Sequence, residues 1–265
     1  MAEGWRKYSA LKTKKGRQQS GLFLIEGYRL AREALISPLS LEACLVTGPF
    51  LESEHWPEIR EHLRLRNLRH QVINQAAFKR LADTETPQGI LLVARQPGQE
   101  QERINLGRKK LLLLLEGVRD PGNLGTLIRT ADWFGVNVVL LSPDCVDPYN
   151  PKVVRASMGS LFYLPVVEVE DFLSVLDQLK ASRFLLVGTS PSAQRVLEKT
   201  QFRAPVAVVL GGEAQGLSPE VQHRMDFMVR IWKYGQAESL NVAIAGGVTL
   251  HWVAGQIFRF KSKAE

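Results

Sequence analysis

Cysteine is scarce in this chain, with only Cys44 and Cys145 among 265 residues. The two lie far apart, and a chain of this length can bury a core without disulfides. A disulfide-stapled secreted fold is therefore excluded. We interpret both cysteines as unpaired thiols in a reducing compartment and predict a cytoplasmic location.

Long apolar runs and metal-ligand clusters are also missing. Apolar runs such as Leu111–Leu115 are short, whereas a membrane-spanning helix needs about 20 apolar residues. The N-terminus, with Trp5, Arg6 and Lys7, has no apolar stretch typical of a secretory signal. The five histidines form no cluster with the cysteines at metal-ligand spacing. We expect no membrane span and no bound metal.

Positive charge is in excess, with 34 lysines and arginines against 27 acids and a formal net charge of +7. Basic residues crowd the first twenty positions, where Glu3 is the only acid. A second basic group comprises Arg60, Arg64, Arg66, Arg69, Lys79 and Arg80. Two interpretations stay open: solvated helix faces with a disordered arm, or a surface that contacts phosphates.

Hydrophobic periodicity predicts two α/β modules. Residues 1–20 are expected to be a basic arm that orders only on binding. Residues 21–96 alternate short apolar strands with helical spacing, which predicts a small α/β domain. Residues 97–110 are polar and contain chain breakers, so we expect an interdomain linker. The strands expected in the first module are Leu22–Ile25, Leu41–Val46, Gln71–Ile73 and Gly89–Ala94, and its helices are Tyr28–Ile36, Glu54–Leu65 and Ala76–Leu81.

The second module, residues 111–265, has near-continuous apolar strands separated by helices, which indicates a parallel sheet covered on both faces. A long last helix is expected from Leu240 towards Phe260. The other expected strands are Leu111–Leu115, Val136–Leu141, Phe184–Val187, Val206–Leu210 and Phe227–Ile231, and the other helices Leu124–Phe134, Lys152–Ser160, Asp171–Lys180 and Pro219–Arg224. Parallel sheets bind ligands beyond the carboxyl ends of their strands, so the loops there are the first candidates for a site.

Three such loops are unusual in composition. The first, Pro121-Gly122-Asn123-Leu124-Gly125, leads into a helix, with Asn123 at the expected N-cap and Arg129 near the loop. The second, 211–217, reads Gly-Gly-Glu-Ala-Gln-Gly-Leu, and Glu213 is its only charge. The third, 239–243, reads Ser-Leu-Asn-Val-Ala, where Ser239 can cap the last helix and Asn241 invites a hydrogen-bonding role.

Each loop alone is equally compatible with a structural role, as a capped helix or a glycine turn. The spacing of the second loop fits neither the dinucleotide fingerprint nor a phosphate-binding loop, which also needs a lysine. A nicotinamide oxidoreductase is therefore disfavoured.

Together, in this order, the three loops closely resemble motifs one to three of the SpoU/TrmH family of RNA ribose methyltransferases, within the SPOUT superfamily. The resemblance covers about residues 111–260. The opening 23–27, Phe-Leu-Ile-Glu-Gly, resembles that of the ribosomal-protein-like RNA-binding domain carried by many members. The resemblance implies an α/β fold with a trefoil knot, a homodimer and S-adenosylmethionine bound in the knot.

The resemblance also implies roles for single residues. The expected cofactor-binding residues are Thr189, Leu210, Gly211, Gly212, Gly216, Ile231, Ser239 and Leu240. The expected catalytic residues are Asn123, Arg129, Glu213, Ser239 and Asn241, with Asn123 orienting Arg129. From the basic charge near the N-terminus, and not from the resemblance, the expected RNA contacts are Lys12, Lys14, Lys15, Arg17 and Arg29. Because a guanidinium keeps its proton above pH 12 or so, Arg129 is expected to stabilise the developing alkoxide.

One departure concerns the segment before the third motif. The family usually has Ile-Pro-Met there, whereas this chain has Ile231-Trp232-Lys233, which removes a fixed turn and adds a bulky ring beside the expected cofactor pocket. Ribosomal RNA of the large subunit is the favoured substrate, because the chain carries a separate RNA-binding module. The alternatives are the same reaction on transfer RNA and a catalytically silent RNA-binding protein.

Overall fold

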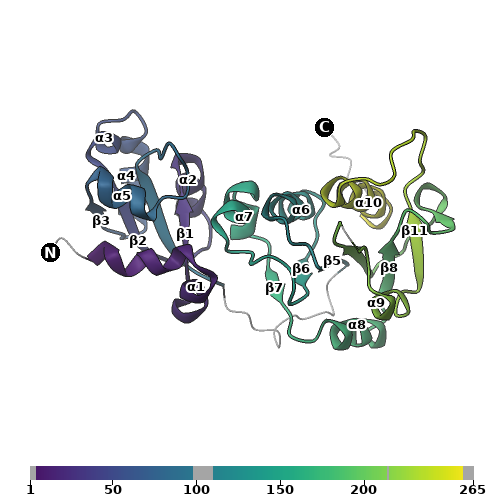
Figure 1. Cartoon of the computed structure of the whole chain (residues 1–265). Helices are drawn as coiled ribbons and strands as arrows, with labels where there is room; N and C mark the ends of the chain where they lie inside the picture. The colour runs from purple at the N-terminus through teal and green to yellow at the C-terminus, as the bar shows by residue number, and fades with distance from the viewer. Residues whose placement is uncertain (1–3, 98–109, 214, 259–265) are drawn as a thin grey trace, which may run out of the picture. The chain divides into compact units, whose positions relative to one another are not determined.

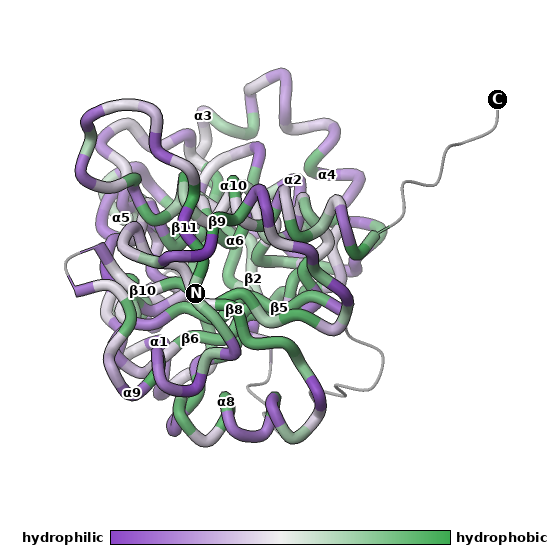
Figure 2. Tube along the Cα trace, turned by 90° about the vertical axis from the view of Figure 1, so that its right-hand side faces the viewer, coloured by the Kyte–Doolittle hydropathy of each residue, from purple (hydrophilic) through white to green (hydrophobic). Residues whose placement is uncertain are grey.

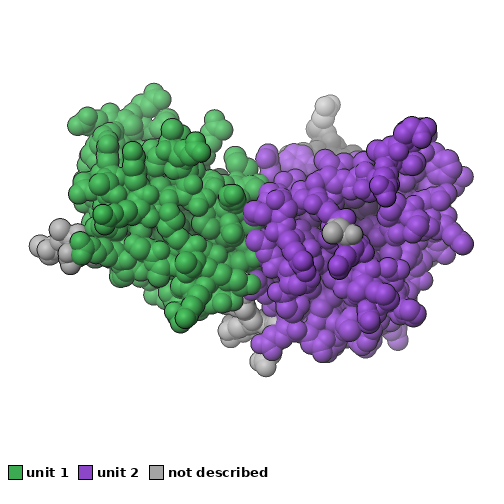
Figure 3. Space-filling view, in the orientation of Figure 1, with its two compact units in different colours: residues 1–98, 147–163 green, residues 99–146, 164–265 purple. Residues whose placement is uncertain are grey.

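The computed structural model describes residues 4–97, 110–213 and 215–258. The chain divides into two compact units, coloured in Figure 3. Unit 1 comprises residues 1–98 and 147–163, and unit 2 comprises residues 99–146 and 164–265. The expected linker, 97–110, lies almost wholly outside the described residues. No described helix has both the length and the apolar character needed to cross a membrane.

The N-terminal segment is helical, contrary to the expectation of an arm that orders only on binding. A 3₁₀ helix, η1 (Gly4–Lys12), is followed by α1 (Lys14–Ser20), which Thr13 caps by accepting a hydrogen bond from the Gly16 amide. Trp5, Tyr8 and Leu11 are buried in the hydrophobic core of unit 1. The prediction of a disordered arm relied on the many basic residues and did not consider these three apolar ones. Their burial offsets the loss of conformational entropy when the segment becomes ordered.

Unit 1 is built on a four-stranded mixed sheet in the order β1-β4-β2-β3. β1 and β2 pair antiparallel with β4, and β3 runs parallel to β2. The strands are β1 (Leu22–Glu26), β2 (Leu41–Val46), β3 (His70–Val72) and β4 (Ile90–Arg95), and the helices are α2 (Tyr28–Ile36), α3 (Gly48–Leu51), α4 (Trp56–Leu65) and α5 (Gln75–Leu81). This confirms the predicted small α/β module.

Segment 147–163 groups with unit 1, although it follows the first strands of the second module. It carries α7 (Pro151–Ala156), which lies against β1, and a short 3₁₀ turn, η4 (Ser160–Phe162). A buried ion pair explains the grouping: Arg17 Nη2 lies 2.6 Å from Asp147 Oδ2, and both side chains are at most 9% exposed. Arg155 of α7 also pairs with Asp83 at 2.7 Å. Breaking such a buried pair costs several kcal/mol, roughly 3–5.

Unit 2 contains a seven-stranded sheet in the order β7-β6-β5-β10-β8-β11-β9, and all its neighbouring strands are parallel. The strands are β5 (Leu111–Glu116), β6 (Val138–Leu141), β7 (Val166–Glu168), β8 (Leu185–Thr189), β9 (Arg195–Val196), β10 (Val206–Gly211) and β11 (Phe227–Arg230). The predicted α/β class with a parallel sheet is confirmed. The two short strands β7 and β9 escaped prediction because they contain only three and two residues.

Helices cover both faces of this sheet. In Figure 1, α6 (Pro121–Trp133) and α10 (Val242–Ile257) lie on one face, and α8 (Phe172–Ala181) and α9 (Pro219–Gln222) on the other. A short turn, η5 (Leu197–Lys199), follows β9. Figure 2 shows the strands as the apolar centre. Their fully buried side chains include Leu112, Leu114, Ala207 and Val209. Helices on both faces make apolar runs necessary at every position of the strand.

Candidate active site

The three predicted motifs meet at one edge of the unit 2 sheet. β5, β10, β8 and β11 are adjacent in the order β5-β10-β8-β11 and parallel, so their carboxyl ends lie at the same edge. The first motif follows β5, the second follows β10, and the third lies between β11 and α10. The topology therefore brings together segments that are up to 120 residues apart, as the rule for parallel sheets predicts.

The first motif forms the start of α6. Asp120, not Asn123, is the N-cap: its side chain accepts a hydrogen bond from the Asn123 amide at 2.8 Å, and Pro121 occupies the first turn. The helix thus begins three residues earlier than predicted, because Asp-Pro is a strong start signal. As a consequence the Asn123 side chain is free of the capping role and available to the site.

The second motif forms a tight turn that folds back on β10. Gly212 bridges Gly216 in an antiparallel pair, and Gly216 has a left-handed φ of +65°. A Cβ on Gly212 would lie 2.3 Å from the Gly117 carbonyl oxygen, so this position accepts no side chain without a backbone shift. Two glycines are therefore required by geometry, and they keep the loop against the first motif.

The third motif forms the start of α10. Asn241 is the N-cap, and its Oδ1 accepts hydrogen bonds from the amides of Ala243 and Ile244. The expectation that Ser239 caps this helix is wrong, because the helix begins two residues later than that cap requires. Ser239 and Leu240 lie in the exposed loop that precedes it. Asn241 combines the capping role with the predicted hydrogen-bonding role.

Side chains from the three motifs form one closed hydrogen-bonded cluster, which we call the Asn-Glu-Asn cluster (Asn123, Glu213 and Asn241). Asn123 Nδ2 donates to Glu213 Oε1 at 2.6 Å. Asn241 Nδ2 donates to the same oxygen at 2.9 Å and to Asn123 Oδ1 at 2.9 Å. Hydrogen bonds to a carboxylate are stronger than bonds between neutral groups. The cluster therefore fixes three loops relative to one another around a single negative charge.

Glu116, at the end of β5, is a site residue that sequence reasoning missed. Its Oε2 accepts a hydrogen bond from the Ser218 amide at 2.9 Å, which ties the first motif's strand to the end of the glycine turn. Ser218 in turn caps α9. The sequence did contain an indication of this role: Glu116 is an acid at the last position of a buried strand, where a charge needs a partner.

Most of the expected cofactor-binding residues lie at or directly after three neighbouring strand ends, whereas Gly216, Ser239 and Leu240 lie in the loops that follow. Leu210 is buried at the end of β10, next to Gly211; Thr189 ends β8; and Ile231 directly follows β11. Thr189 and Ile231 are half-buried, and Leu240 is 49% exposed. Backbone groups at parallel strand ends beside an exposed apolar side chain suit a ligand with a purine ring and polar tail. The residues present therefore fit S-adenosylmethionine.

Arg129 is exposed on the third turn of α6, not near the loop as predicted. Its position differs from that of Asn123 by six residues, or about 120° around the helix axis. Asn123 therefore contacts Glu213 and Asn241 and not Arg129. Within the described parts of the chain, no group pairs with the Arg129 guanidinium.

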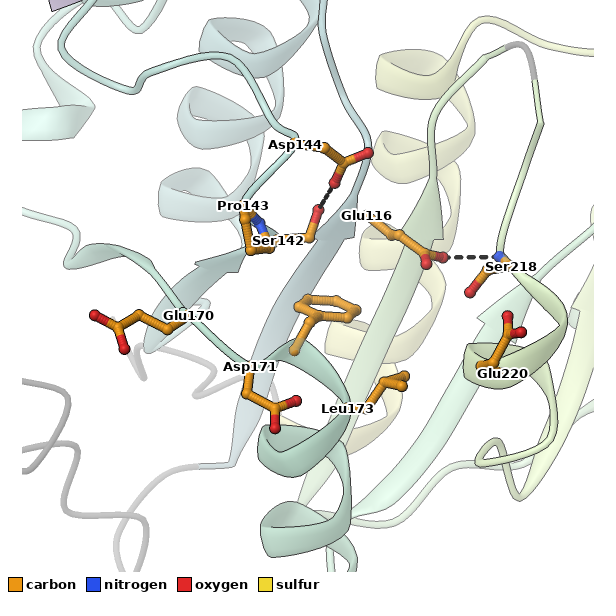
Figure 4. Close-up of a pocket in the computed structure, with 10 residues that line it drawn as sticks. Glu116, Ser142, Pro143, Asp144, Glu170, Asp171, Leu173, Ser218 and Glu220 are labelled. Atoms are coloured by element: carbon orange, nitrogen blue, oxygen red, sulfur yellow. Dashed lines mark hydrogen bonds between the residues drawn. The ribbon is translucent and has the colours of Figure 1, made fainter. Parts of the chain in front are cut away.

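An acidic hollow of about 310 Å³ lies at the same sheet edge, beyond β5, β6 and β7 (Figure 4). Its walls carry the carboxylates of Glu116, Asp144, Glu170, Asp171 and Glu220. Asp144 forms an ion pair with Arg119 at 3.5 Å, whereas the others increase the negative potential. Such a hollow repels phosphate groups, which separates it from any RNA path. Among the described residues, no group of His, Cys, Asp or Glu is arranged to hold a metal.

The predicted RNA contacts lie in unit 1 and differ in exposure. Lys12, Lys14, Lys15 and Arg29 are exposed, and Lys12 Nζ donates to the Ala82 carbonyl oxygen at 2.9 Å. Arg17 is only 3% exposed, and its guanidinium is taken up by Asp147 and the Leu11 carbonyl. Its positive charge therefore stabilises the fold of unit 1.

Comparison with known families gives two matches that together cover most of the chain. Residues 110–251 match the SpoU rRNA Methylase family, and residues 5–92 match the MRM3-like substrate binding domain. The first match spans the three motifs and the unit 2 sheet. The second spans β1, β2 and β3 of unit 1 and ends within β4.

Individual relatives align over nearly the whole chain. The 23S rRNA (guanosine(2553)-2'-O)-methyltransferase RlmP of Bacillus subtilis is 35% identical over 251 residues, 95% of this chain and 94% of that protein. A 23S rRNA (uridine(2479)-2'-O)-methyltransferase of Streptomyces viridochromogenes is 31% identical over 241 residues, 89% of this chain and 83% of that protein.

A solved structure agrees with these relatives. The SpoU methyltransferase AviRb of Streptomyces viridochromogenes, in complex with AdoMet, superposes with a TM-score of 0.83 at 29% identity, covering 94% of this chain and 96% of that one. The family indicated by the three motifs is confirmed. This chain belongs to the SpoU rRNA methylase family, with an N-terminal substrate-binding domain.

Proposed function

We propose that this protein transfers a methyl group from S-adenosylmethionine to a ribose 2'-hydroxyl of 23S-type ribosomal RNA. The observation that carries the proposal is the Asn-Glu-Asn cluster, in which all three motifs contribute a side chain to one hydrogen-bonded group. In this arrangement the carboxylate of Glu213 and the amides of Asn123 and Asn241 lie in the same three motifs as the expected cofactor-binding residues. A catalytically silent RNA-binding protein would not need it.

The choice of ribosomal RNA rests on two relatives that align over most of the chain. The Bacillus subtilis and Streptomyces viridochromogenes proteins are both named as 23S rRNA 2'-O-methyltransferases, one for a guanosine and one for a uridine. Because the target base differs between them, the nucleotide does not transfer to this chain. The match of residues 5–92 to a substrate binding domain supports RNA-substrate recognition by residues 21–96 and catalysis by residues 111–265.

Bound at the ends of β8, β10 and β11, S-adenosylmethionine supplies an electrophilic methyl group on its sulfonium. The backbone around Gly211, Ile231 and Leu240 holds and orients it there, with Thr189 at the pocket wall. We propose that the stretch from β10 to α10 forms the family's trefoil knot. This proposal rests on the match of residues 110–251 to the SpoU rRNA Methylase family.

The chain's side chains position the nucleophile. A ribose hydroxyl is weakly acidic, so it needs alignment with the methyl group and stabilisation of the charge that develops on its oxygen. Glu213, with its fixed amide donors, accepts a hydrogen bond and orients a hydroxyl that approaches the cluster. Arg129 stabilises the alkoxide through the positive charge of its guanidinium. Ser239, two residues before Asn241, contributes a further donor from the loop.

We propose a homodimer formed through α6 and α10. Trp133 is 84% exposed, and Ile244 and Val248, one turn apart on α10, are 56% and 38% exposed. Arg129 lies one turn before Trp133, on the same face of α6. Burial of this apolar face by a second copy removes it from water and gives Arg129, which pairs with none of the described residues, a fixed environment.

The RNA path in unit 1 includes exposed Lys12, Lys14, Lys15 and Arg29, whose charges suit a phosphate backbone. Transfer RNA stays an alternative substrate for the same reaction. We also propose a cytoplasmic location; a ribosomal substrate and two free, buried thiols support it.

The test is methyl transfer from tritium-labelled S-adenosylmethionine to unmodified 23S rRNA and, separately, to transfer RNA, followed by mapping of 2'-O-methyl positions. We expect incorporation into 23S rRNA at one site, and its loss in Arg129→Ala with cofactor binding retained. Incorporation into transfer RNA alone would overturn the ribosomal substrate. A protein that binds no S-adenosylmethionine at all would overturn the enzyme proposal.

A further inference from the structure

The loop between β11 and α10 presents aromatic side chains to solvent. Tyr234 is 93% exposed, the highest value among the large apolar side chains of the described residues, and Trp232 is 43% exposed. Every residue from 232 to 241 is exposed, and Figure 1 shows this loop projecting beyond β11 and α10. Two exposed aromatic rings two positions apart cost solvation free energy unless a partner covers them.

The two rings are arranged against one another. Their centroids are 6.5 Å apart at an interplanar angle of 72°, which is the favourable edge-to-face geometry. The Arg230 guanidinium lies over the Trp232 ring, 5.4 Å from its centroid. Trp232 is thereby held between a cation and Tyr234, whereas Tyr234 keeps an open face towards solvent.

Positive charge is in excess on the segment that carries the rings and on the segment that begins at the neighbouring strand β9. Segments 195–203 and 230–241 carry five lysines and arginines against two glutamates. Arg195 lies over the Phe227 ring at 4.0 Å, and Lys233 stands exposed between the two loop aromatics. Aromatic faces interleaved with cations are the combination by which proteins hold single-stranded RNA, because every base has a face that stacks and every nucleotide carries a phosphate.

The loop lies close to the chemistry but is tied to its outer side. β11 is two strands from β10 in the sheet, or roughly 10 Å at 4.8 Å per strand. The Trp232 amide donates to Glu198 Oε1 at 3.4 Å, on η5, which follows the edge strand β9. The start of the loop is thus anchored away from β10, where Gly211 and the Asn-Glu-Asn cluster lie.

We propose that this loop is a stacking platform for an unpaired base of the RNA substrate, next to the nucleotide that is methylated. The base stacks on the exposed ring of Tyr234, which meets Trp232 in edge-to-face contact. Arg195, Arg230 and Lys233 neutralise the flanking phosphates. The inference rests on the proposed function, and it explains the replacement of Pro-Met by Trp232-Lys233 before the third motif.

The test measures RNA affinity without requiring methyl transfer. A fluorescently labelled 12-nucleotide RNA of mixed sequence is titrated with the full-length protein, and the same strand in a perfect duplex is the control. Tyr234→Ala is expected to weaken binding of the single strand about tenfold or more, as loss of a base stack does. Tyr234→Trp is expected to bind as the parent does, because a flat ring suffices. The duplex, whose bases are already stacked, is expected to bind both variants equally.

Two controls separate this role from the others that the loop could have. S-adenosylmethionine binding by calorimetry and the sedimentation coefficient are expected to be unchanged in Tyr234→Ala. Equal affinity of Tyr234→Ala and the parent for the single strand would overturn the proposal. Loss of cofactor binding would assign the ring to the cofactor pocket, and a shift to a smaller species would assign it to a subunit interface; either also overturns it. Failure of the parent to methylate RNA would count against the proposed function and not against this inference.

Discussion

Asn241 has two separable roles at a single side chain, since its oxygen caps α10 and its nitrogen donates to Glu213 and Asn123. Asn241→Asp keeps the cap but replaces the donor with a second carboxylate beside Glu213. We expect it to lower methyl transfer about 10- to 100-fold, the loss that follows when a hydrogen bond to a charged group is removed. Thermal stability is expected to fall modestly, because the cap is kept while the new carboxylate repels Glu213.

The matched variant is Asn241→Ala, which loses both roles. It is expected to show the same loss of methyl transfer and, in addition, a free energy of unfolding lower by roughly 1 kcal/mol through loss of the cap. Denaturant unfolding and tritium incorporation measure the two effects. Near-parental activity of Asn241→Asp would contradict the role given to the cluster.

The two cysteines make a second residue-scale prediction. Burial raises the pKa of the Cys44 thiol to about 12 and raises that of Cys145 as well. A thiol reacts as its thiolate, so neither should react with a disulfide reagent in the native protein at pH 8. Both should react at once in denaturant, which is the control. Rapid modification of the native protein would show that one of them is accessible.

At the scale of elements, the contact of α10 with α6 depends on a glycine. A Cβ on Gly246 would lie 2.4 Å from Leu127 Cδ2 and 2.9 Å from Leu210 Cδ1, whereas one on Gly255 of the same helix meets nothing within 4 Å. Both changes to alanine raise helix propensity by about 1 kcal/mol. We expect Gly255→Ala to raise the free energy of unfolding.

Gly246→Ala is expected to lower it, because the clash costs about 1–3 kcal/mol and exceeds the propensity gain. Chemical denaturation of both variants tests this. Equal stabilisation by the two substitutions would mean that α10 does not lie as close to α6 as the structure places it.

At the scale of the whole molecule, the exposed face of α6 and α10 predicts the oligomeric state. Val248→Asp places a charge in the proposed subunit interface, where an unpaired buried carboxylate opposes association. We expect a monomer in sedimentation velocity, with reduced methyl transfer if Arg129 needs the second copy. Val72→Asp, on a comparably exposed valine of unit 1, is the matched control and is expected to leave the dimer intact. A Val248→Asp protein that still sediments as a dimer would place the interface elsewhere.

The sequence alone identified the class of fold, the family and the three motifs. Apolar strands buried on both faces, such as Leu111–Leu115, and helices with clear periodicity, such as Tyr28–Ile36, were predictable because local pattern and tertiary burial agree. Helix starts were less predictable. Asp120 and Asn241, not Asn123 and Ser239, are the caps, because several capping residues stand in each loop and only backbone geometry selects one.

Tertiary structure alone decided which side chains meet. No local pattern indicates that Asn123, Glu213 and Asn241 share hydrogen bonds, because the order of strands in the sheet, not their order in the chain, sets that neighbourhood. Tertiary structure also decided the role of Arg17. Its charge predicted an RNA contact, but it is buried and pairs with Asp147, 130 residues away in the chain. The sequence determines which functional groups each loop carries. Tertiary packing determines which loops lie together, and therefore which of these groups act on one another.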